Sequence, residues 1–291
     1  MEVLTNQQFS DACCQLTTEL EYNLYDAVLY ENGTMYRYEH QPANLANNSY
    51  SVSKIFTATA IGILVDDGKV SLNDLITEIL KNEIHTAYDP QWDKVTVEHA
   101  LAHKMGLRNL ALDLDSDDIG QYGTKDFLTY VFTHNLTDEP GTFYNYTDTA
   151  YYLLSRVVSK ITGQKLDDFL LDRLFRPLDF AEAAWSTCPY GYPMGGTGLY
   201  LRTHDMLKLA VVYLKQGVWE GKRILSENWI QTALEKELGV TGSETMSHCK
   251  TGAHGQILAF CPTTQKAIAI HGFNNGNYEF RGAAVREFLE K

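Results

Sequence analysis

The chain has 291 residues, of which 44% are hydrophobic and 21% are charged, so it can bury one large core or two interleaved ones. Only seven prolines are spread along it, which argues against disordered and fibrous classes. The formal net charge of -13 argues against binding to nucleic acids or anionic membranes, because such binding needs clustered lysines and arginines. A small molecule is therefore the expected partner, and the oligomeric state stays open.

The start of the chain, MEVLTNQQFSDACCQL, has no basic segment followed by an apolar run, and no stretch is long enough to cross a bilayer. We therefore expect a cytoplasmic protein. The five cysteines are odd in number and irregularly spaced, which predicts buried thiols rather than disulfides or a zinc site. His99 and His103 have the spacing of metal ligands on a helix, but no third ligand accompanies them, so neither a metal nor a cofactor is expected.

The first predicted elements are a hairpin and a buried helix. Residues 25–40 read YDAVLYENGTMYRYEH, and the Asn32-Gly33 dipeptide between the two β-prone runs favours a tight antiparallel turn. From Ser51, apolar residues recur at helical spacing until the run closes at Gly68. The pattern predicts an amphipathic and largely buried helix.

The middle of the chain is mostly helical in pattern, and its last predicted helix stops at Gly163. A glycine-rich stretch follows at 195–198, and short strands are expected before the last helix. Because strands occur early and late, one sheet is expected from both ends of the chain. Further helices are predicted over 96–103, 203–216, 227–235 and 278–290.

These elements predict an α/β (α+β) fold with two parts. Residues 1–70 and 181–291 are expected to form an antiparallel sheet flanked by helices. Residues 71–180 are expected to form an inserted, mostly helical domain. The candidate site residues, described next, lie in both parts.

Ser51 and Lys54 form a Ser-x-x-Lys pair at the start of the predicted helix. Residues three apart share one helix face, so Lys54 is placed to handle the proton of the Ser51 hydroxyl. The free N–H groups at the helix start favour negative charge on the serine oxygen. The spacing alone is weakly specific, because Ser247 and Lys250 match it too, although glycines interrupt any helix after them. The alternative role of Ser51 is a simple helix cap.

A turn-rich loop, residues 140–148, leads directly into the next predicted helix and carries Tyr146. A phenol can act as a base when nearby cations lower its pKa. Asp148 is equally well placed to cap the helix. Tyr144 and Tyr151 are predicted to be core residues.

The segment Lys250-Thr251-Gly252-Ala253 lies where strand signals resume. A backbone N–H at such a strand edge can supply half of an oxyanion hole, and the lysine can hold a substrate carboxylate. The alternative is a solvated lysine before a turn.

Taken together and in order, three motifs resemble those of the class C β-lactamase and penicillin-binding-protein-related serine hydrolases. Their S-x-x-K, Y-x-N and K-T-G sets are similar to Ser51-Val52-Ser53-Lys54, Tyr146-Thr147-Asp148 and Lys250-Thr251-Gly252. Residues 252–256 are also similar to the nylon-oligomer hydrolase branch, which includes esterases. The resemblance covers nearly the whole chain from about residue 20.

The resemblance implies a β-lactamase/transpeptidase-like fold, with the site between a sheet domain and a helical domain. It implies that Ser51 attacks a carbonyl while Lys54 and Tyr146 transfer its proton, without a metal or cofactor. The N–H groups of Ser51 and Ala253 would hold the oxyanion. The substrate-binding residues implied are Asp148, Lys250, Thr251 and Gly252.

One departure from the family pattern shapes the functional hypothesis. Asp148 stands where the Y-x-N motif has asparagine, and an ionised carboxylate accepts hydrogen bonds but cannot donate them. The leading hypothesis is therefore a serine hydrolase of small esters or amides. The alternatives are a β-lactamase or D-amino-acid peptidase of the same fold, or a penicillin-binding-type sensor that reacts without turnover.

Overall fold

A computed structural model describes residues 4–19, 23–40, 46–109, 111–115, 119–242, 246–274 and 278–291. The chain divides into two compact units. The sheet unit comprises Met1–Val52, Arg176–Ala184 and Tyr200–Lys291, and the helical unit comprises Ser53–Phe175 and Trp185–Leu199.

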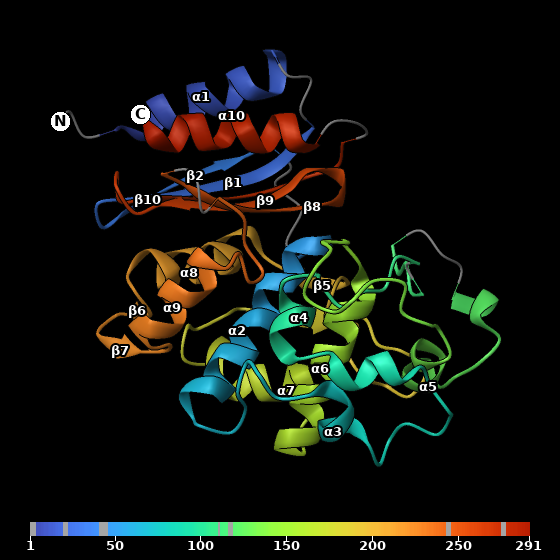
Figure 1. Ribbon diagram of the computed structural model, residues 1–291. Coiled ribbons are helices and arrows are strands. Elements are labelled where there is room, and N and C mark those ends of the chain that lie inside the picture. The colour runs from blue at the N-terminus through green and yellow to red at the C-terminus, as the bar shows by residue number, and fades with distance from the viewer. Residues whose placement is uncertain are drawn as a thin grey trace. The chain divides into compact units, whose positions relative to one another are not determined.

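The sheet unit is built on a five-stranded antiparallel sheet of order β2-β1-β10-β9-β8. Helices α1 (Asn6–Glu19) and α10 (Tyr278–Glu290) lie side by side on one face of this sheet, and α8 (Thr203–Leu214) packs on the other (Figure 1). The strands are β1 (Leu24–Glu31), β2 (Thr34–Glu39), β8 (His248–Gly252), β9 (Gln256–Cys261) and β10 (Lys266–Gly272).

The predicted hairpin and the sheet from both ends of the chain are confirmed. β1 and β2 join through Asn32 and Gly33, which have φ angles of 47° and 90°, as a tight turn between antiparallel strands requires. The core between the sheet and its outer helices includes Phe9, Leu29 and Ile268. Helix α1, which supplies Phe9, was not predicted.

Smaller elements complete the sheet unit and its borders. A 3-10 turn, η1 (Tyr50–Val52), precedes the first helix of the helical unit, and another, η5 (Ala253–Gly255), connects β8 to β9. A three-stranded sheet has the order β3-β5-β4. The remaining elements are β3 (Asn47–Asn48), β4 (Ala183–Trp185), β5 (Leu199–Leu201), β6 (Val218–Trp219), β7 (Lys222–Arg223) and α9 (Glu227–Glu235).

The helical unit has α2 (Ser53–Asp66) at its centre. All twelve residues from Ser53 to Leu64 are buried, so this is a core helix covered on every side. It packs against α6 (Asp148–Thr162) and α7 (Leu166–Leu170). The other helices are α3 (Ile76–Leu80), η2 (Pro90–Lys94), α4 (Val97–Leu101), η3 (Ile119–Tyr122), α5 (Phe127–Phe132) and η4 (Leu171–Phe175).

The boundary between the units differs from the predicted one. We predicted that residues 1–70 belong to the sheet domain, whereas α2 is part of the helical unit because its apolar surface is buried there. Residues Trp185–Leu199 also return to the helical unit. Among the described residues, no helix combines the length and apolar character that crossing a membrane requires.

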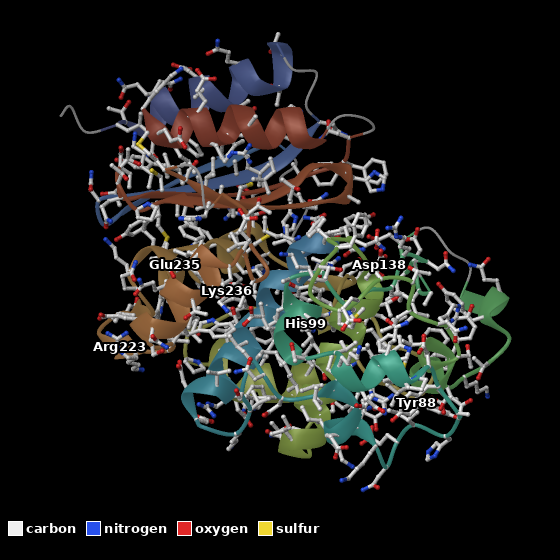
Figure 2. The ribbon with its side chains drawn as sticks, in the orientation of Figure 1. Tyr88, His99, Asp138, Arg223, Glu235 and Lys236 are labelled. Atoms are coloured by element: carbon white, nitrogen blue, oxygen red, sulfur yellow. The ribbon has the colours of Figure 1, made fainter. Side chains whose placement is uncertain are left out.

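His99 lies on α4 and serves that helix (Figure 2). Its backbone N–H donates to the Thr96 hydroxyl at 3.2 Å, and its Nδ1 accepts from the Thr96 N–H at 3.3 Å. This reciprocal pair is a capping box, which satisfies two N–H groups at the helix start. The ring is therefore engaged by its own helix at Nδ1.

Candidate active site

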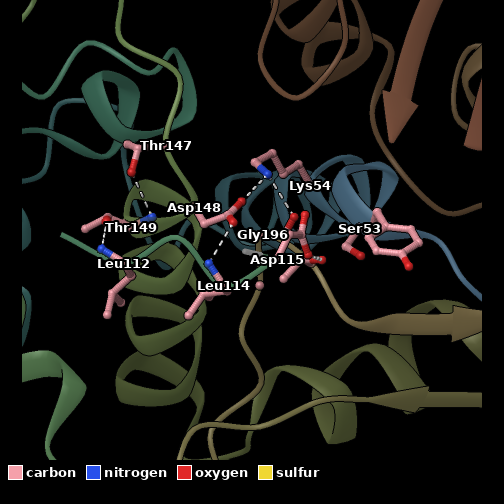
Figure 3. Close-up of polar contacts among 12 residues, drawn as sticks. Ser53, Lys54, Leu112, Leu114, Asp115, Thr147, Asp148, Thr149 and Gly196 are labelled. Atoms are coloured by element: carbon pink, nitrogen blue, oxygen red, sulfur yellow. Dashed lines mark hydrogen bonds and ion pairs between the residues drawn. The ribbon is translucent and has the colours of Figure 1, made fainter. Parts of the chain in front are cut away.

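Lys54 is a fully buried lysine on the first turn of α2. Its Nζ lies 2.5 Å from Asp148 Oδ1 and donates to the carbonyl oxygen of Gly196 at 2.8 Å (Figure 3). A buried ammonium is strongly unfavourable unless it is paired and hydrogen-bonded. Asp148 and Gly196 supply that compensation from two distant segments of the helical unit.

Asp148 faces Lys54 and is 8% exposed. Its second oxygen, Oδ2, accepts from the backbone N–H of Leu114 at 3.3 Å. The helix cap of α6 is Thr147, whose hydroxyl accepts from the Thr149 N–H at 3.1 Å, so the alternative in which Asp148 caps the helix is wrong. A methyl group on Gly196 would lie 2.9 Å from Asp148 Oδ1, so the close approach requires glycine there.

The charge of Lys54 follows from these contacts. Burial by itself lowers the pKa of Lys54, but the charge of Asp148 and interactions with Tyr146 outweigh burial and raise the pKa above its ordinary value. Lys54 is therefore an ammonium group near neutral pH. In this state it can donate hydrogen bonds and stabilise negative charge, but it cannot accept a proton.

Tyr146 lies beside this ammonium group. Lys54 Nζ is 4.6 Å from the centre of the Tyr146 ring, and the side chain is 39% exposed. Since the tyrosine raises the pKa of Lys54, the ammonium in turn favours negative charge on the phenol oxygen. The structure therefore brings Lys54, Tyr146 and Asp148 together within the helical unit.

His103 holds the segment that carries Tyr146, a role that the sequence analysis missed. The carbonyl oxygen of His103 accepts from the Asn145 N–H at 2.8 Å, and its Nδ1 accepts from the Thr147 N–H at 3.3 Å. The two ring centres of His103 and Tyr146 are 4.5 Å apart. His103 is 6% exposed and has a left-handed φ of 57°, and no sequence pattern signals this role.

A second carboxyl group, Asp115, lies near the Lys54 and Asp148 pair (Figure 3). It accepts a hydrogen bond from the Thr197 hydroxyl. Burial raises the pKa of Asp115, although the Thr197 hydrogen bond lowers it, and the charge of Asp148 raises it further. The sequence analysis did not single out Asp115 for this site, because its neighbours come from distant parts of the chain.

The two tyrosines predicted as core residues differ. Tyr151 is fully buried, and its hydroxyl donates to the carbonyl oxygen of Leu101 at 3.0 Å. Tyr144 is 55% exposed, so that prediction is wrong. It belongs to the loop before α6, where its ring contacts His103 edge-on.

In the sheet unit, Ser51 and the end of β8 are neighbours. A methyl group on Gly252 would lie 2.5 Å from the carbonyl oxygen of Ser49 and 3.2 Å from the backbone nitrogen of Ser51. Glycine thus lets the backbone of β8 approach the turn that carries Ser51. Ala253, the predicted second oxyanion donor, is the next residue.

The other predicted residues of the sheet unit lie on β8. Lys250 is 8% exposed, so the alternative of a solvated lysine is wrong, and Thr251 is partly buried. Ser247 precedes the same strand and its hydroxyl donates to Glu290 Oε1 at 2.5 Å. The second Ser-x-x-Lys match is therefore not helical.

Ser51 and Lys54 are joined through the chain itself. Ser51 is the middle residue of η1, and Lys54 is the second residue of α2, which follows η1 directly. Ser51, Gly252 and Ala253 thus gather in the sheet unit, and Lys54, Tyr146 and Asp148 in the helical unit.

Known proteins are similar to this chain over most of its length. A family model described as Beta-lactamase matches residues 43–288. Penicillin-binding protein 4 of Amycolatopsis lactamdurans is 34% identical over 246 residues, which cover 72% of this chain and 61% of the relative. The 6-aminohexanoate-dimer hydrolase of Paenarthrobacter ureafaciens is 24% identical over 290 residues, covering 87% of this chain and 74% of the relative.

A solved structure shows the same fold. A putative 6-aminohexanoate-dimer hydrolase from Bacillus anthracis superposes with a TM-score of 0.77 at 18% identity, covering 94% of this chain and 81% of the other. Among the first curated relatives, the match spans between 25% and 74% of the relative's own length. The family model covers most of the chain, and the chain belongs to the β-lactamase family.

Proposed function

We propose that the protein is a serine hydrolase that acts on a small ester or amide through an acyl-enzyme, with Ser51 as the nucleophile. The observation that carries the proposal is the buried Lys54 ammonium, held by Asp148 and Gly196 beside Tyr146, three residues after Ser51. A buried, charged and fully coordinated lysine next to an exposed phenol is costly to build and is typical of a catalytic site.

In the proposed acylation step, the Ser51 oxygen forms a bond to the substrate carbonyl carbon. Its proton passes to the Tyr146 phenolate, which the Lys54 ammonium stabilises. The carbonyl oxygen becomes an oxyanion that accepts from the N–H groups of Ser51 and Ala253. When the bond to the leaving group breaks, Tyr146 returns the proton to that group.

Deacylation repeats these steps with water. A water molecule gives its proton to the Tyr146 phenolate and adds to the acyl carbon, and the Ser51 oxygen leaves and takes the proton back. The products are an acid and an alcohol or amine. Lys54 stays an ammonium throughout, so its role is to hold charge.

The state of Asp148 favours esters and simple amides over β-lactams. Both of its oxygens are engaged, one by Lys54 and the other by the Leu114 N–H, and neither can donate to a substrate carbonyl. One relative is named as a hydrolase of the 6-aminohexanoate dimer and another as a penicillin-binding protein. The second name keeps a sensor that is acylated without turnover as the second candidate.

Intact mass after incubation with a fluorophosphonate probe and with activated esters tests the proposal. The variants are Ser51→Ala and, as a matched control, Ser247→Ala, which alters the serine of the second Ser-x-x-Lys match. We expect one probe adduct on the wild type and on Ser247→Ala, none on Ser51→Ala, and steady ester turnover. Labelling of Ser51→Ala, or of no protein, would contradict the nucleophile, and a single burst without turnover would favour the sensor.

A further inference from the structure

Two bulky residues with left-handed backbones flank the proposed oxyanion donors in the sheet unit. Tyr50 directly precedes Ser51 and has a φ of 44°, and His254 directly follows Ala253 and has a φ of 59°. Such angles are uncommon for large side chains and cost roughly 1–3 kcal/mol each. Strained residues of this kind cluster at functional sites.

The side chains of these two residues form a row of rings with Phe273. The Tyr50 and His254 ring centres are 5.0 Å apart in an edge-on arrangement at 63°. The His254 and Phe273 rings are stacked, with centres 4.4 Å apart and planes at 11°. We call Tyr50, His254 and Phe273 the aromatic row.

Backbone hydrogen bonds fix the position of Phe273, the exposed member of the aromatic row. The Asn274 N–H donates to the carbonyl oxygen of His254 at 2.8 Å, and the Phe273 N–H donates to that of Asn23 at 3.0 Å. The Asn274 side chain also accepts from the Asn23 N–H. Phe273 is nevertheless 46% exposed, so an apolar ring is held in place with nearly half of its surface open.

We propose that the aromatic row binds an aromatic ring, or an apolar group of similar size, on the substrate. The inference rests on the proposed function, because it places this group next to the carbonyl that Ser51 attacks. Consecutive Cα atoms are about 3.8 Å apart, and Tyr50 and His254 each adjoin a proposed oxyanion donor in the chain, so the aromatic row begins close to the proposed position of that carbonyl. Stacking on a pre-positioned ring loses little side-chain entropy.

The exposure of Phe273 supports this choice of substrate. Phe273 offers an open apolar surface in the same unit as Ser51. Ring contact is then a form of recognition that the sheet unit can supply. The predicted substrate class is an ester or amide with an aromatic group on its acyl or alcohol side.

Two substrate series test the proposal. The first compares p-nitrophenyl phenylacetate with p-nitrophenyl acetate, and the second compares benzyl acetate with ethyl acetate by titration of the released acid. The proteins are the wild type, Phe273→Ala and Phe273→Leu. The control is Met35→Ala, which shortens an exposed apolar side chain on β2, the sheet edge opposite β8.

We expect the wild type to prefer the aromatic member of at least one series in kcat/KM. Phe273→Ala should lower that preference about tenfold, Phe273→Leu less, and Met35→Ala not at all. An unchanged preference in both series for Phe273→Ala, with esters still turned over, overturns the aromatic row. This outcome leaves the serine hydrolase proposal intact.

A binding measurement separates the inference from turnover. In Ser51→Ala, a titration with phenylacetamide should shift the NMR signals of the Phe273 ring, and acetamide at the same concentrations should not. Equal effects of the two amides, or none, overturn the inference whether or not any ester is hydrolysed. If phenylacetamide binds at Phe273 but the fluorophosphonate probe does not label Ser51 in the wild type, only the proposed function is contradicted.

Discussion

In the helical unit, Lys54 is held by charge, whereas in the sheet unit Ser51 is held by close backbone packing. Lys54 depends on one carboxylate at 2.5 Å in a fully buried setting. Ser51 depends on the absence of a side chain at Gly252. Substitutions around Lys54 should therefore change protonation states. Substitutions around Ser51 should instead displace the backbone sterically.

The two units also differ in whether their buried polar groups carry charge. The sheet unit contains His271, a fully buried histidine whose Nδ1 lies 2.8 Å from Gln256 Oε1. Gln256 in turn donates to the carbonyl oxygen of Gly272 at 2.7 Å. Burial lowers the pKa of His271, so this network is neutral and fixes geometry without adding a charge to the sheet unit.

Lys54→Met should have the largest effect, because it leaves the Asp148 carboxylate buried without its partner. We expect a loss of about 3–5 kcal/mol in the free energy of unfolding and on the order of a 10³-fold loss in kcat. Urea denaturation and ester turnover measure the two effects. The double variant Lys54→Met/Asp148→Asn should regain most of the stability but none of the activity; recovery of activity would mean that Lys54 has no role in the chemistry.

Gly252→Ala should reduce activity on the order of 10²-fold, because the added methyl group would lie 2.5 Å from the Ser49 carbonyl oxygen and displace a proposed oxyanion donor. The pH dependence of kcat/KM should keep its shape, since no charge changes. Gly282→Ala is the control, because its methyl group would meet side-chain atoms rather than backbone, the nearest being a Thr251 methyl at 3.1 Å. Equal activity of the two variants would show that the packing at Gly252 does not position the donors.

Local signals predicted much of this molecule. The Asn32-Gly33 turn and the glycine that ends α6 at position 163, with a φ of 73°, were predicted because a few neighbouring residues determine them. The last two long helices were predicted over the ranges that the structure has. α1 was missed because its polar residues mask the apolar face that carries Phe9.

Long-range contacts could not be predicted in this way. Lys54 and Asp148 are 94 residues apart, and the sequence analysis weighed Asp148 as a helix cap or a substrate ligand. The roles of His103 and Asp115 depend on rings and hydroxyls from other segments. A family motif identifies such residues as a set, but only the three-dimensional structure shows which residue contacts which.

His271 should make the sheet unit sensitive to acid. Burial lowers the pKa of His271 to about 3 from an unfolded value of about 6.5. Below pH 6.5 the unfolded chain binds a proton that the folded chain does not, so stability is present above pH 6.5 and is lost as the pH falls toward 3. Acidification from pH 6.5 to 4.5 should therefore lower the free energy of unfolding by roughly 2–3 kcal/mol through His271.

Urea denaturation at both pH values, for the wild type and His271→Asn, measures this contribution. The variant should lose less stability on acidification than the wild type does. His40→Asn, which replaces an exposed histidine of the same unit, should follow the wild type. If all three proteins lose the same stability, His271 does not stay neutral in the folded state.

Asp148→Asn should have the smallest effect on turnover and the most specific effect on its pH dependence. Lys54 and Tyr146 interact, so their first proton leaves the pair as a unit, whichever atom carries it. Removing the carboxylate removes the charge that retains this proton, while burial still disfavours the ammonium. The rise of kcat/KM with pH should therefore shift to lower pH by about 1 unit or more.

Asp138→Asn provides the matched control, because it removes one carboxylate from the surface of the same unit (Figure 2). Its pH profile should coincide with that of the wild type, which separates the local effect of Asp148 from a change in net charge. If Asp148→Asn leaves the profile in place or moves it to higher pH, the carboxylate does not set the charge of the pair. The helical unit would then resemble the sheet unit, with its catalytic groups held by packing alone.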